Sequence, residues 1–290
     1  MNRRLVLGTV QFGLLYGIAN QVGKVSRDEV AEILGHARAA GVDTLDTAIG
    51  YGDSEVILGE VGVDQWQVIT KLPEIPLTCA DVASWVQDSV ADSIDRLRVP
   101  RLRGLLLHRP QQLLGPHGDE LYRALVVVRD QGKVEKIGVS VYGPDELDVI
   151  WPSYQFDLVQ APFNILDRRL VSSGWLNRLH QAGTEVHVRS IFLQGLLLMD
   201  ATNRPVKFNL WQSLWDDWHH WLTDHALTPL QACLSFATSQ PEINRVVVGV
   251  DSLEQLREIL ACAINSSTIP PESLMSDDLD LINPSHWSSP

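Results

Sequence analysis

Eight short apolar runs, each the length of a β-strand, recur along this chain with helix-like stretches between them. The runs occupy residues 5–8, 42–46, 66–71, 102–108, 134–141, 156–161, 185–190 and 243–249. Strands that alternate with helices, with no succession of hairpins, predict a parallel sheet. Eight such units within about 250 residues predict a closed (β/α)8 TIM barrel of the α/β class, whose active site lies at the C-terminal rim of the strands.

The helices expected between these runs follow from caps and periodicity. Ser26 begins one that ends at Gly41, and Glu29, three positions after Ser26, would complete a capping box. A short helix starts at Asp53 or Ser54. Further helices are expected over residues 79–98, 118–131, 171–182, 228–239 and 252–263, and from Pro144 onward. Residues 9–24 are expected to form a long loop.

Two segments fall outside this alternation. Trp211, Trp215, Trp218 and Trp221 lie at roughly helical spacing, which favours a helix packed over the barrel mouth rather than direct substrate contact. Residues 269–290 are polar and bounded by prolines, and we expect a surface tail there. Because no domain boundary, repeat or low-complexity tract interrupts the chain, residues 1–290 are expected to form one barrel domain.

Composition narrows the possible functions. Hydrophobic residues make up 45% and charged residues 20% of the 290, as in a globular protein with a large core. No apolar run approaches the roughly 20 residues of a membrane span, and the N-terminus lacks a signal-peptide core, so we expect a cytoplasmic protein with no membrane partner. The net charge of -13 argues against a nucleic-acid partner, which would require a basic patch. Cys79, Cys233 and Cys262 are expected to be reduced thiols, and neither they nor the adjacent His219 and His220 have metal-ligand spacing.

Four ionisable side chains stand at or just after the ends of neighbouring runs. Asp46, Lys71 and His108 end the second, third and fourth runs, and Tyr51 lies on the loop after the second. Taken singly, each of the first three has an ordinary structural explanation: a strand-end cap, a solvated charge and a core histidine. Together they share one predicted rim, where an ammonium held by an acid would lower the pKa of a tyrosine and a histidine could polarise a carbonyl oxygen. The set suits proton donation to an oxygen that is becoming an alkoxide.

The sequence around these four residues also resembles a known family. The patterns D-T-A-x-x-Y-G, I-T-K and L-L-L-H, which contain Asp46, Tyr51, Lys71 and His108 in that order, are similar to those of the aldo-keto reductase superfamily. The resemblance covers nearly the whole chain, from G-T-V-Q-F-G to V-V-V-G-V-D-S-L-E-Q-L. It implies an NAD(P)H-dependent oxidoreductase that reduces an aldehyde or ketone to an alcohol. Sugars are among the carbonyl substrates that the resemblance allows. The four residues would be its catalytic set, with Tyr51 as the proton donor.

The same resemblance implies where a nicotinamide cofactor would bind. Ser140 and Gln160 would hold its amide, although Val141 stands where the family has asparagine. Arg189 takes the place of a tyrosine that stacks on the nicotinamide, and a guanidinium plane can stack on a ring too. Gln194 would line a strap over the pyrophosphate. The full set of expected cofactor contacts is Gly8, Thr9, Ser140, Gln160, Arg189, Ser190, Gln194, Gly195, Gly249, Asp251, Ser252, Gln255 and Arg257.

The loop after the last run bears on the choice between NADP and NAD. Gly249 opens it onto a helix at Ser252, whose N-terminus could bind a phosphate, although Ser252 and Gln255 equally fit a capping box. Asp251 could accept a hydrogen bond from the ribose 2′-hydroxyl of NAD, or cap the helix. Arg257 could meet the 2′-phosphate of NADP. Together with the resemblance, these residues predict NADP(H) with modest discrimination over NAD(H).

The expected partner is a small-molecule carbonyl substrate, with Phe12 and Tyr16 as walls of its pocket. Arg168 and Arg169 could meet an anionic substrate, but a surface ion pair is the expected role. Two other functions stay open. One is a cofactor-binding regulatory partner protein with little turnover, and the other is a barrel lyase that uses Lys71 as a Schiff-base amine.

Overall fold

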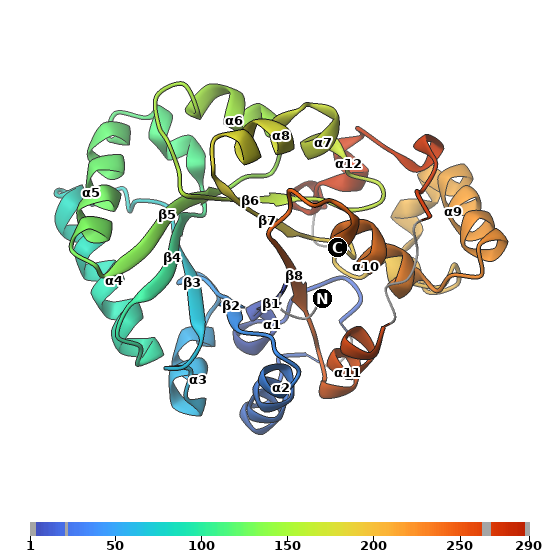
Figure 1. Ribbon diagram of the computed structural model, residues 1–290, viewed down its shortest axis with the longest axis horizontal. Helices are drawn as coiled ribbons and strands as arrows, with labels where there is room; N and C mark the ends of the chain where they lie inside the picture. Colours follow the sequence, from blue (N-terminus) through green and yellow to red (C-terminus); the bar gives the residue numbers. More distant parts are fainter. Residues whose placement is uncertain (1–3, 21–22, 263–267, 288–290) are drawn as a thin grey trace.

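A computed structural model describes residues 4–20, 23–262 and 268–287. Eight parallel strands close into a barrel in the order of the sequence (Figure 1). The strands are β1 (Leu5–Gly8), β2 (Thr44–Asp46), β3 (Gln67–Leu72), β4 (Leu102–Leu107), β5 (Val134–Ser140), β6 (Leu158–Pro162), β7 (Glu185–Arg189) and β8 (Arg245–Gly249). All eight coincide with the expected runs to within two residues at either end, which confirms the (β/α)8 barrel.

Helices surround the barrel and fill the connections between its strands (Figure 1). The α-helices are α1 (Val10–Gly13), α2 (Arg27–Ala39), α3 (Ser54–Val61), α4 (Val82–Leu97), α5 (Gly118–Asp130), α6 (Pro144–Ile150), α7 (Arg169–Ser172), α8 (Trp175–Gln181), α9 (Gln212–Asp224), α10 (Pro229–Ser239), α11 (Leu253–Ala261) and α12 (Leu279–Ile282). Short 3-10 helices include η2 (Pro110–Leu114), η3 (Leu196–Leu198), η4 (Val206–Trp211), η5 (Glu272–Leu274) and η6 (Pro284–His286).

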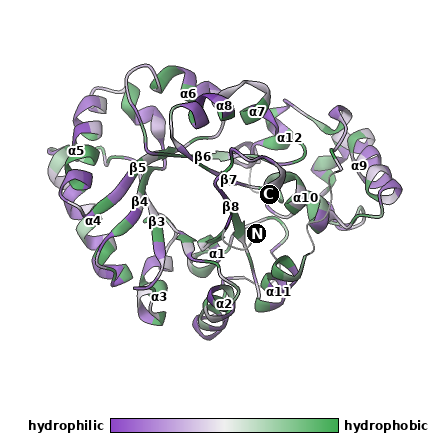
Figure 2. Cartoon of the chain, in the orientation of Figure 1, coloured by the Kyte–Doolittle hydropathy of each residue, from purple (hydrophilic) through white to green (hydrophobic). Residues whose placement is uncertain are grey.

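The strands are apolar because both of their faces are covered. Every residue of β1, β2 and β6 is buried, with one set of side chains inside the barrel and the other under the helices. The ring closes where β1 pairs with β8, in a register that places Leu5 opposite Val246 and Gly8 opposite Gly249. The outer helices mix hydrophobic and hydrophilic residues (Figure 2), as expected for helices with one buried face.

Helix α4 illustrates how the sequence sets such a helix. The Asp81 side chain accepts a hydrogen bond from the backbone N–H of Ser84 and so caps the first turn. Its buried residues recur every three or four positions and are Val82, Val86, Val90, Ser93 and Leu97. The helix therefore begins at its cap, three residues after the expected start at residue 79.

Three local expectations differ from the structure. The loop expected after β1 contains the short helix α1. The helix expected over residues 171–182 is two helices, because Gly174 adopts a positive φ of 80° between α7 and α8. Ser26 caps α2 as expected, but the Glu29 carboxylate accepts a hydrogen bond from Leu253 of α11 instead of completing the capping box. The expected end of α11 at residue 263 lies outside the described residues.

The tryptophan-rich helix α9 stands beside the barrel and not over its mouth. Figure 1 shows it at the outer edge of the molecule, beyond α10, and it packs against η4 and η5. Trp215, Trp218 and Trp221 are buried in these contacts. The segment after residue 268 is more than a polar surface tail, since Leu274 and Leu281 are buried. It therefore forms part of the packed structure at this side.

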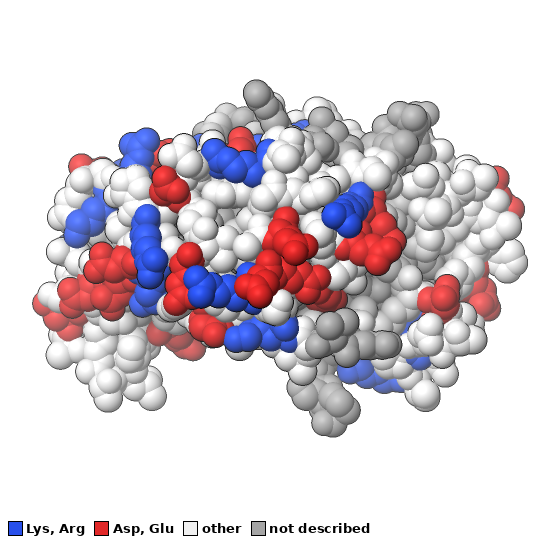
Figure 3. All heavy atoms as spheres, turned by 90° about the horizontal axis from the view of Figure 1, so that it is seen from below, with Lys and Arg blue, Asp and Glu red and all other residues white. Residues whose placement is uncertain are grey.

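Charged side chains of both signs are interspersed on the face that Figure 3 shows, without a broad basic field. Such a mixture is typical of a solvated surface, and the exposed ion pairs of the protein include Lys24 with Asp53 at 2.8 Å. In the part of the chain that the structure describes, no helix combines the length and apolar character needed to cross a membrane.

Candidate active site

The buried ion pair between Asp46 and Lys71 forms the floor of the site. Asp46 ends β2, and Lys71 lies in β3, where its side chain is 1% exposed. The Lys71 ammonium donates hydrogen bonds to Asp46 Oδ1 at 2.5 Å and to the backbone carbonyl of Thr47 at 2.9 Å. A buried charge requires such partners, because desolvation otherwise disfavours it.

Tyr51 and His108 complete the group above this floor. The Lys71 ammonium nitrogen lies 5.1 Å from the centroid of the Tyr51 ring. The rings of Tyr51 and His108 meet edge to face, with centroids 5.8 Å apart. His108 directly follows β4, and Tyr51 lies in the turn between β2 and α3. The structure therefore brings together the four side chains that the sequence places at three neighbouring strand ends.

Charges around the site set the protonation of two of these groups. Burial alone would lower the pKa of Lys71, but the neighbouring Asp46 and Tyr51 outweigh it, so that pKa is raised and the ammonium stays charged. The pKa of His108 falls from 6.5 to about 4, mainly through burial and then through the nearby cations Lys71 and Arg189. At neutral pH the site thus holds a charged lysine and a neutral imidazole.

A chain of hydrogen bonds joins Asp46 to the far wall of the barrel. Gln160 of β6 donates from its amide nitrogen to Asp46 Oδ2 at 2.7 Å. Its carbonyl oxygen accepts a bond from the Ser140 hydroxyl at 3.2 Å, and Ser140 and Gln160 are register partners on β5 and β6. Both oxygens of Asp46 are therefore occupied, one by Lys71 and one by Gln160.

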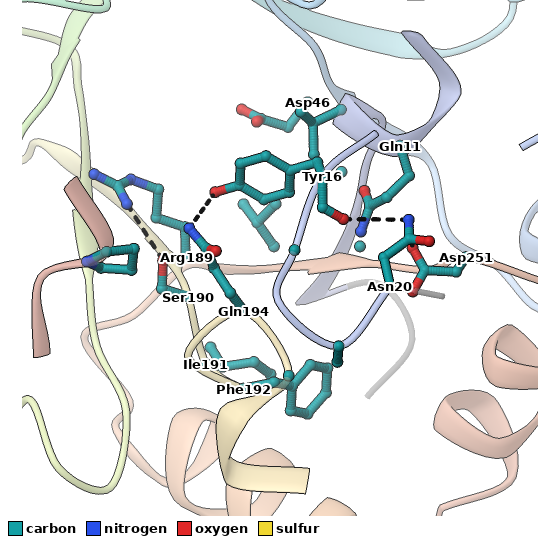
Figure 4. A pocket seen from close by; sticks show the side chains of 18 of the residues that line it. Gln11, Tyr16, Asn20, Asp46, Arg189, Ser190, Ile191, Phe192, Gln194 and Asp251 are labelled. Atoms are coloured by element: carbon teal, nitrogen blue, oxygen red, sulfur yellow. Dashed lines mark hydrogen bonds between the residues drawn. The ribbon is translucent and has the colours of Figure 1, made fainter. Parts of the chain in front are cut away.

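A cavity of about 870 Å³ opens above these residues. It extends from Asp46 and Arg189 towards Asp251 (Figure 4). Ligand pockets for drug-sized molecules span about 300–1,000 Å³, so this one is large enough for an extended ligand. The expected site residues that line it are Gly8, Thr9, Tyr16, Asp46, Tyr51, His108, Ser140, Gln160, Arg189, Ser190, Gln194, Gly195, Gly249, Asp251 and Gln255.

Four expected site residues do not line the cavity. Lys71 lies beneath it, where it contacts Asp46 and the Tyr51 ring. Phe12 is fully buried in α1, so it packs in the core instead of walling a substrate pocket. Arg257 is an exposed residue of α11, and Ser252 uses its hydroxyl to cap that helix by accepting from Gln255 N–H.

The end of the cavity near α11 is acidic. Asp251 and Glu258 both line it. Asn20 donates to Asp251 Oδ1 at 3.0 Å, and burial raises the pKa of this carboxyl. The Glu29 carboxylate already accepts the N–H of Leu253 at the first turn of α11, at 3.2 Å. One backbone N–H of the expected phosphate site at this helix N-terminus is therefore already used by a protein carboxylate. The Gln255 side-chain oxygen accepts from the N–H of Asp251 and not from that of Ser252, so it does not complete a capping box.

Two loops meet across the cavity. In the loop after β7, the non-glycine residues Ser190, Leu193 and Gln194 have φ between 48° and 59°, a region that costs such residues energy. The Gln194 amide donates to the Tyr16 hydroxyl at 3.1 Å (Figure 4). Burial raises the pKa of Tyr16, which lies close to Tyr51 and Arg189. The β7 loop and the loop after α1 thus form a bridge over the pocket.

Several lining residues were not expected from the sequence. Gln11 lies in α1, and its side-chain oxygen is buried and accepts no hydrogen bond from any described residue. Arg109 and Tyr142 follow His108 and Ser140 closely but belong to no recognisable motif. For Gln11, the only signal in the sequence was its place in the run G-T-V-Q-F-G, where the family resemblance begins. Pro284 and Ser285 of η6 also line the cavity, although they belong to the segment expected to be a surface tail.

The remaining candidate residues have structural partners. Arg169 pairs with Asp167 at 2.9 Å, and Arg168 donates to the carbonyl oxygens of Pro270 and Pro271. His219 lies beside Arg204, away from the cavity lining. Within residues 4–20, 23–262 and 268–287, no group of three or more His, Cys, Asp or Glu side chains is placed to hold a metal ion.

Comparison with known proteins agrees with this architecture. A model of the Aldo/keto reductase family matches residues 4–273. The 6-dehydroglucose reductase of Novosphingobium aromaticivorans is 31% identical over 136 residues, which are 41% of this chain and 43% of that protein. An aldo-keto reductase of Mycobacterium sp. (strain JLS) is 31% identical over 180 residues, 57% of this chain and 60% of that protein. The chain thus spans about half the length of the curated relatives that it matches.

Solved structures give the same fold over a longer stretch. The holo form of an aldo-keto reductase from Bacillus halodurans has a TM-score of 0.73 to this chain, at 18% identity. The match covers 93% of this chain and 89% of that one. At this low identity the likeness concerns the barrel alone.

Proposed function

The chain belongs to the aldo/keto reductase family, and on this premise we propose that it reduces the carbonyl group of an aldehyde or ketone with a reduced nicotinamide cofactor. Members of the family are oxidoreductases that act on carbonyl compounds. The observation that carries the proposal is the convergence of Tyr51 and His108 above the buried Asp46–Lys71 pair, at the floor of the cavity. One relative is a 6-dehydroglucose reductase, which supports a sugar-type carbonyl among the candidate substrates.

Tyr51 is the proposed proton donor. When bound, a reduced nicotinamide supplies a hydride to the carbonyl carbon, so the carbonyl oxygen gains negative charge and needs one proton. Tyr51 gives its phenolic proton to that oxygen and is itself left with a negative charge. The buried Lys71 ammonium, 5.1 Å from the ring centroid, offsets this charge. Solvent then returns the proton to Tyr51, and the alcohol leaves.

His108 has a different role from Tyr51. With a pKa of about 4, its imidazole is neutral at physiological pH and does not compete as the acid. A neutral imidazole still carries one N–H, which can donate a hydrogen bond to the carbonyl oxygen and hold it beside Tyr51. Asp46 acts through Lys71 by fixing the ammonium and keeping it charged.

The cavity fits an extended cofactor such as a nicotinamide dinucleotide. With the reactive ring at Tyr51, the rest of the molecule can occupy the arm towards β8 and α11. Ser140 and Gln160 would hold the nicotinamide end, and Ser190 and Gln194 would cover the middle. The unpaired buried oxygen of Gln11 offers an acceptor for a hydroxyl or amide donor along the same wall.

The charges in the arm of the cavity towards β8 and α11 support NAD(H) as the cofactor, although the family resemblance favours NADP(H). A 2′-phosphate there would meet the carboxylates of Asp251 and Glu258. Arg257, the base expected to bind that phosphate, does not line the cavity. A ribose 2′-hydroxyl, in contrast, can donate a hydrogen bond to a carboxylate such as Asp251.

Turnover of a carbonyl panel tests the proposal. Purified protein is mixed with NADH or NADPH and with simple aldehydes, ketones and aldose sugars, and the loss of reduced-nicotinamide absorbance is followed. We expect carbonyl-dependent oxidation that disappears in the Tyr51→Phe variant. If both cofactors bind but neither is oxidised with any member of the panel, the protein is better explained as a cofactor-sensing regulatory protein.

The lyase alternative is disfavoured by the surroundings of Lys71. A Schiff base requires a neutral amine, whereas the raised pKa of Lys71 keeps it as an ammonium. Its nitrogen is also committed to Asp46 and the Thr47 carbonyl, and the residue does not line the cavity. Borohydride trapping of a carbonyl compound on Lys71 would restore this alternative.

A further inference from the structure

Two arginine side chains share one aromatic residue at the reacting end of the cavity. The guanidinium carbon of Arg109 lies 5.6 Å, and that of Arg189 lies 4.8 Å, from the centroid of the Tyr142 ring. Arg109 follows the catalytic His108 after β4, Arg189 ends β7, and Tyr142 follows β5. All three line the same cavity as Tyr51 and His108.

Neither guanidinium has a carboxylate partner among the described residues. Arg189 donates to the Val141 carbonyl at 3.0 Å and to the Ser190 hydroxyl at 3.3 Å. The contact of the Arg109 guanidinium is the Tyr142 ring. Arg96, another partly buried arginine, is neutralised by Glu55 at 2.7 Å. The charges of Arg109 and Arg189 are therefore left to whatever enters the cavity.

The acids nearest to this end are already engaged. Asp46 accepts from Lys71 and from Gln160. Glu146 lies near Arg189, but it accepts the Tyr142 N–H at 2.5 Å and a bond from Gln111, and it does not line the cavity. Since His108 is neutral, the charged residues that line this end of the cavity are Arg109, Arg189 and Asp46, and Lys71 already neutralises Asp46 from below. A neutral carbonyl compound would leave this excess positive charge uncompensated.

We propose that the carbonyl substrate carries a carboxylate or phosphate group, which Arg109 and Arg189 bind beside Tyr142 while the carbonyl oxygen faces Tyr51 and His108. Guanidinium groups suit this role because their planar set of N–H donors matches carboxylate and phosphate oxygens. Arg168 and Arg169 do not line the cavity, and Arg169 already pairs with Asp167 at 2.9 Å. The inference rests on the proposed reductase function and narrows its substrate class. It assigns Arg189 to the substrate in place of the nicotinamide stacking that the family resemblance suggested.

A phosphate of the cofactor is a second possible source of the same anionic chemistry. Removing Arg109 should have different effects on cofactor binding if the anion belongs to the substrate or to the cofactor. Arg109 lies beside His108, at the end of the cavity where the carbonyl would bind, and the arm proposed for the rest of the cofactor runs towards Asp251. If Arg109 binds the substrate, its removal should leave the dissociation constant of NADH unchanged. If it binds the cofactor, that constant should rise.

The decisive test compares an anionic carbonyl with a neutral analogue of the same shape. The pairs are 4-carboxybenzaldehyde with methyl 4-formylbenzoate, and glyceraldehyde 3-phosphate with glyceraldehyde. In the parent, we expect kcat/KM to be at least tenfold higher for the anionic member of one pair. Which pair responds distinguishes carboxylate from phosphate. In Arg109→Met this ratio should fall towards one, and in Arg109→Glu it should invert.

Arg101→Met is the matched control. Arg101 is an exposed arginine just before β4, at the opposite end of the same strand, and it pairs with Glu135 at 2.7 Å. Its removal should leave the ratio as in the parent. An equal kcat/KM for charged and neutral members in the parent, with good turnover of both, would overturn the anion proposal while the reductase function stands.

A binding measurement separates failure of the proposal from failure of the reductase function. Calorimetry measures the affinity for 4-(hydroxymethyl)benzoate, which is the alcohol product of 4-carboxybenzaldehyde, and for its methyl ester. This measurement needs no turnover. We expect the acid to bind at least tenfold more tightly than the ester in the parent, with this preference lost in Arg109→Met and kept in Arg101→Met. Glycerol 3-phosphate and glycerol are the matching product pair for a phosphate substrate. Equal binding of the anionic and neutral members in both pairs would reject the proposal even in a protein that reduces no aldehyde.

Discussion

The α-carbon of Gly13 lies directly against the backbone carbonyl of Tyr51. A β-carbon on residue 13 would come 1.8 Å from that oxygen and 2.7 Å from the backbone nitrogen of Ser54. Helix α1 therefore supports the turn that carries the proposed proton donor, and only a residue without a side chain allows this approach.

Gly13→Ala should accordingly reduce both stability and turnover. Relieving the contact has to move the Tyr51 turn, and forced overpacking of this kind costs about 1–3 kcal/mol. We expect a lower melting temperature and a kcat that falls more than cofactor affinity does. Gly35→Ala in α2 is the control, since a β-carbon there meets nothing within 4 Å. Unchanged kcat in Gly13→Ala would show that the turn tolerates displacement.

Tyr51→Phe should abolish carbonyl reduction while the cofactor still binds. The substitution removes the proton donor and keeps the ring that packs against His108. A general acid contributes about 10²–10⁴-fold, so kcat should drop by at least a hundredfold. Fluorescence titration with NADH should give a dissociation constant close to that of the parent. Turnover within tenfold of the parent would rule out Tyr51 as the acid.

Lys71→Met should damage the fold as well as the reaction. It leaves the Asp46 carboxylate buried with Gln160 as its remaining side-chain partner, and breaking a buried ion pair costs about 3–5 kcal/mol. The double variant Lys71→Met with Asp46→Asn removes both charges, so it should regain part of the free energy of unfolding without regaining turnover. Denaturant unfolding and kcat are the two measurements. Equal losses of stability in the single and double variants would contradict the pairing argument.

His108 should make the protein less stable in acid. Its pKa is about 4 in the folded protein and near 6.5 when unfolded, so the unfolded chain binds the proton more readily. The contribution is complete above about pH 6.5 and is lost as the pH falls through 4, with a total on the order of 3 kcal/mol. The His108→Gln variant should show a smaller loss of unfolding free energy between pH 7 and pH 4.5. Parallel curves for parent and variant would contradict the lowered pKa.

Cofactor choice should follow the acidic end of the cavity. We expect the parent to bind NADH at least about tenfold more tightly than NADPH, a difference of about 1.4 kcal/mol. Asp251→Asn keeps the side-chain shape and removes a charge, so NADPH should bind more tightly and NADH more weakly. Arg257→Ala should alter neither constant. A parent that prefers NADPH, or a loss of NADPH affinity in Arg257→Ala, would favour the cofactor that the family resemblance suggests.

The four catalytic candidates could be placed from the sequence because local patterns and a repeating architecture fix them. Asp46, Lys71 and His108 each end an apolar run, and the closed barrel brings the ends of neighbouring parallel strands to one rim. Tyr51 follows β2 by five residues, close enough for the turn to return it to that rim. No long-range information beyond strand order was needed.

The residues around the rest of the cavity could not be placed in the same way. Arg257 is close in sequence to the loop after β8, but its position on α11 leaves it exposed to solvent. The carboxylate at the first turn of α11 comes from Glu29, 224 positions earlier in the chain, and no local spacing encodes that contact. Phe12 was expected in a loop, whereas α1 folds it into the core. Arg109 and Tyr142 follow the neighbouring strands β4 and β5, but neither ends an apolar run or belongs to a motif that would mark it in the sequence.

The pairing of β1 with β8 also constrains how the chain can fold. Arg4, just before β1, donates to the Thr238 carbonyl 234 positions away, so the seam joins the first strand of the barrel to the last. Contacts over such separations repay the loop-closure entropy only after the intervening units have formed. We therefore expect the seam to be the last part of the ring to form, which would make the acidic arm beside β8 a late product of folding and the Asp46–Lys71 floor an earlier one.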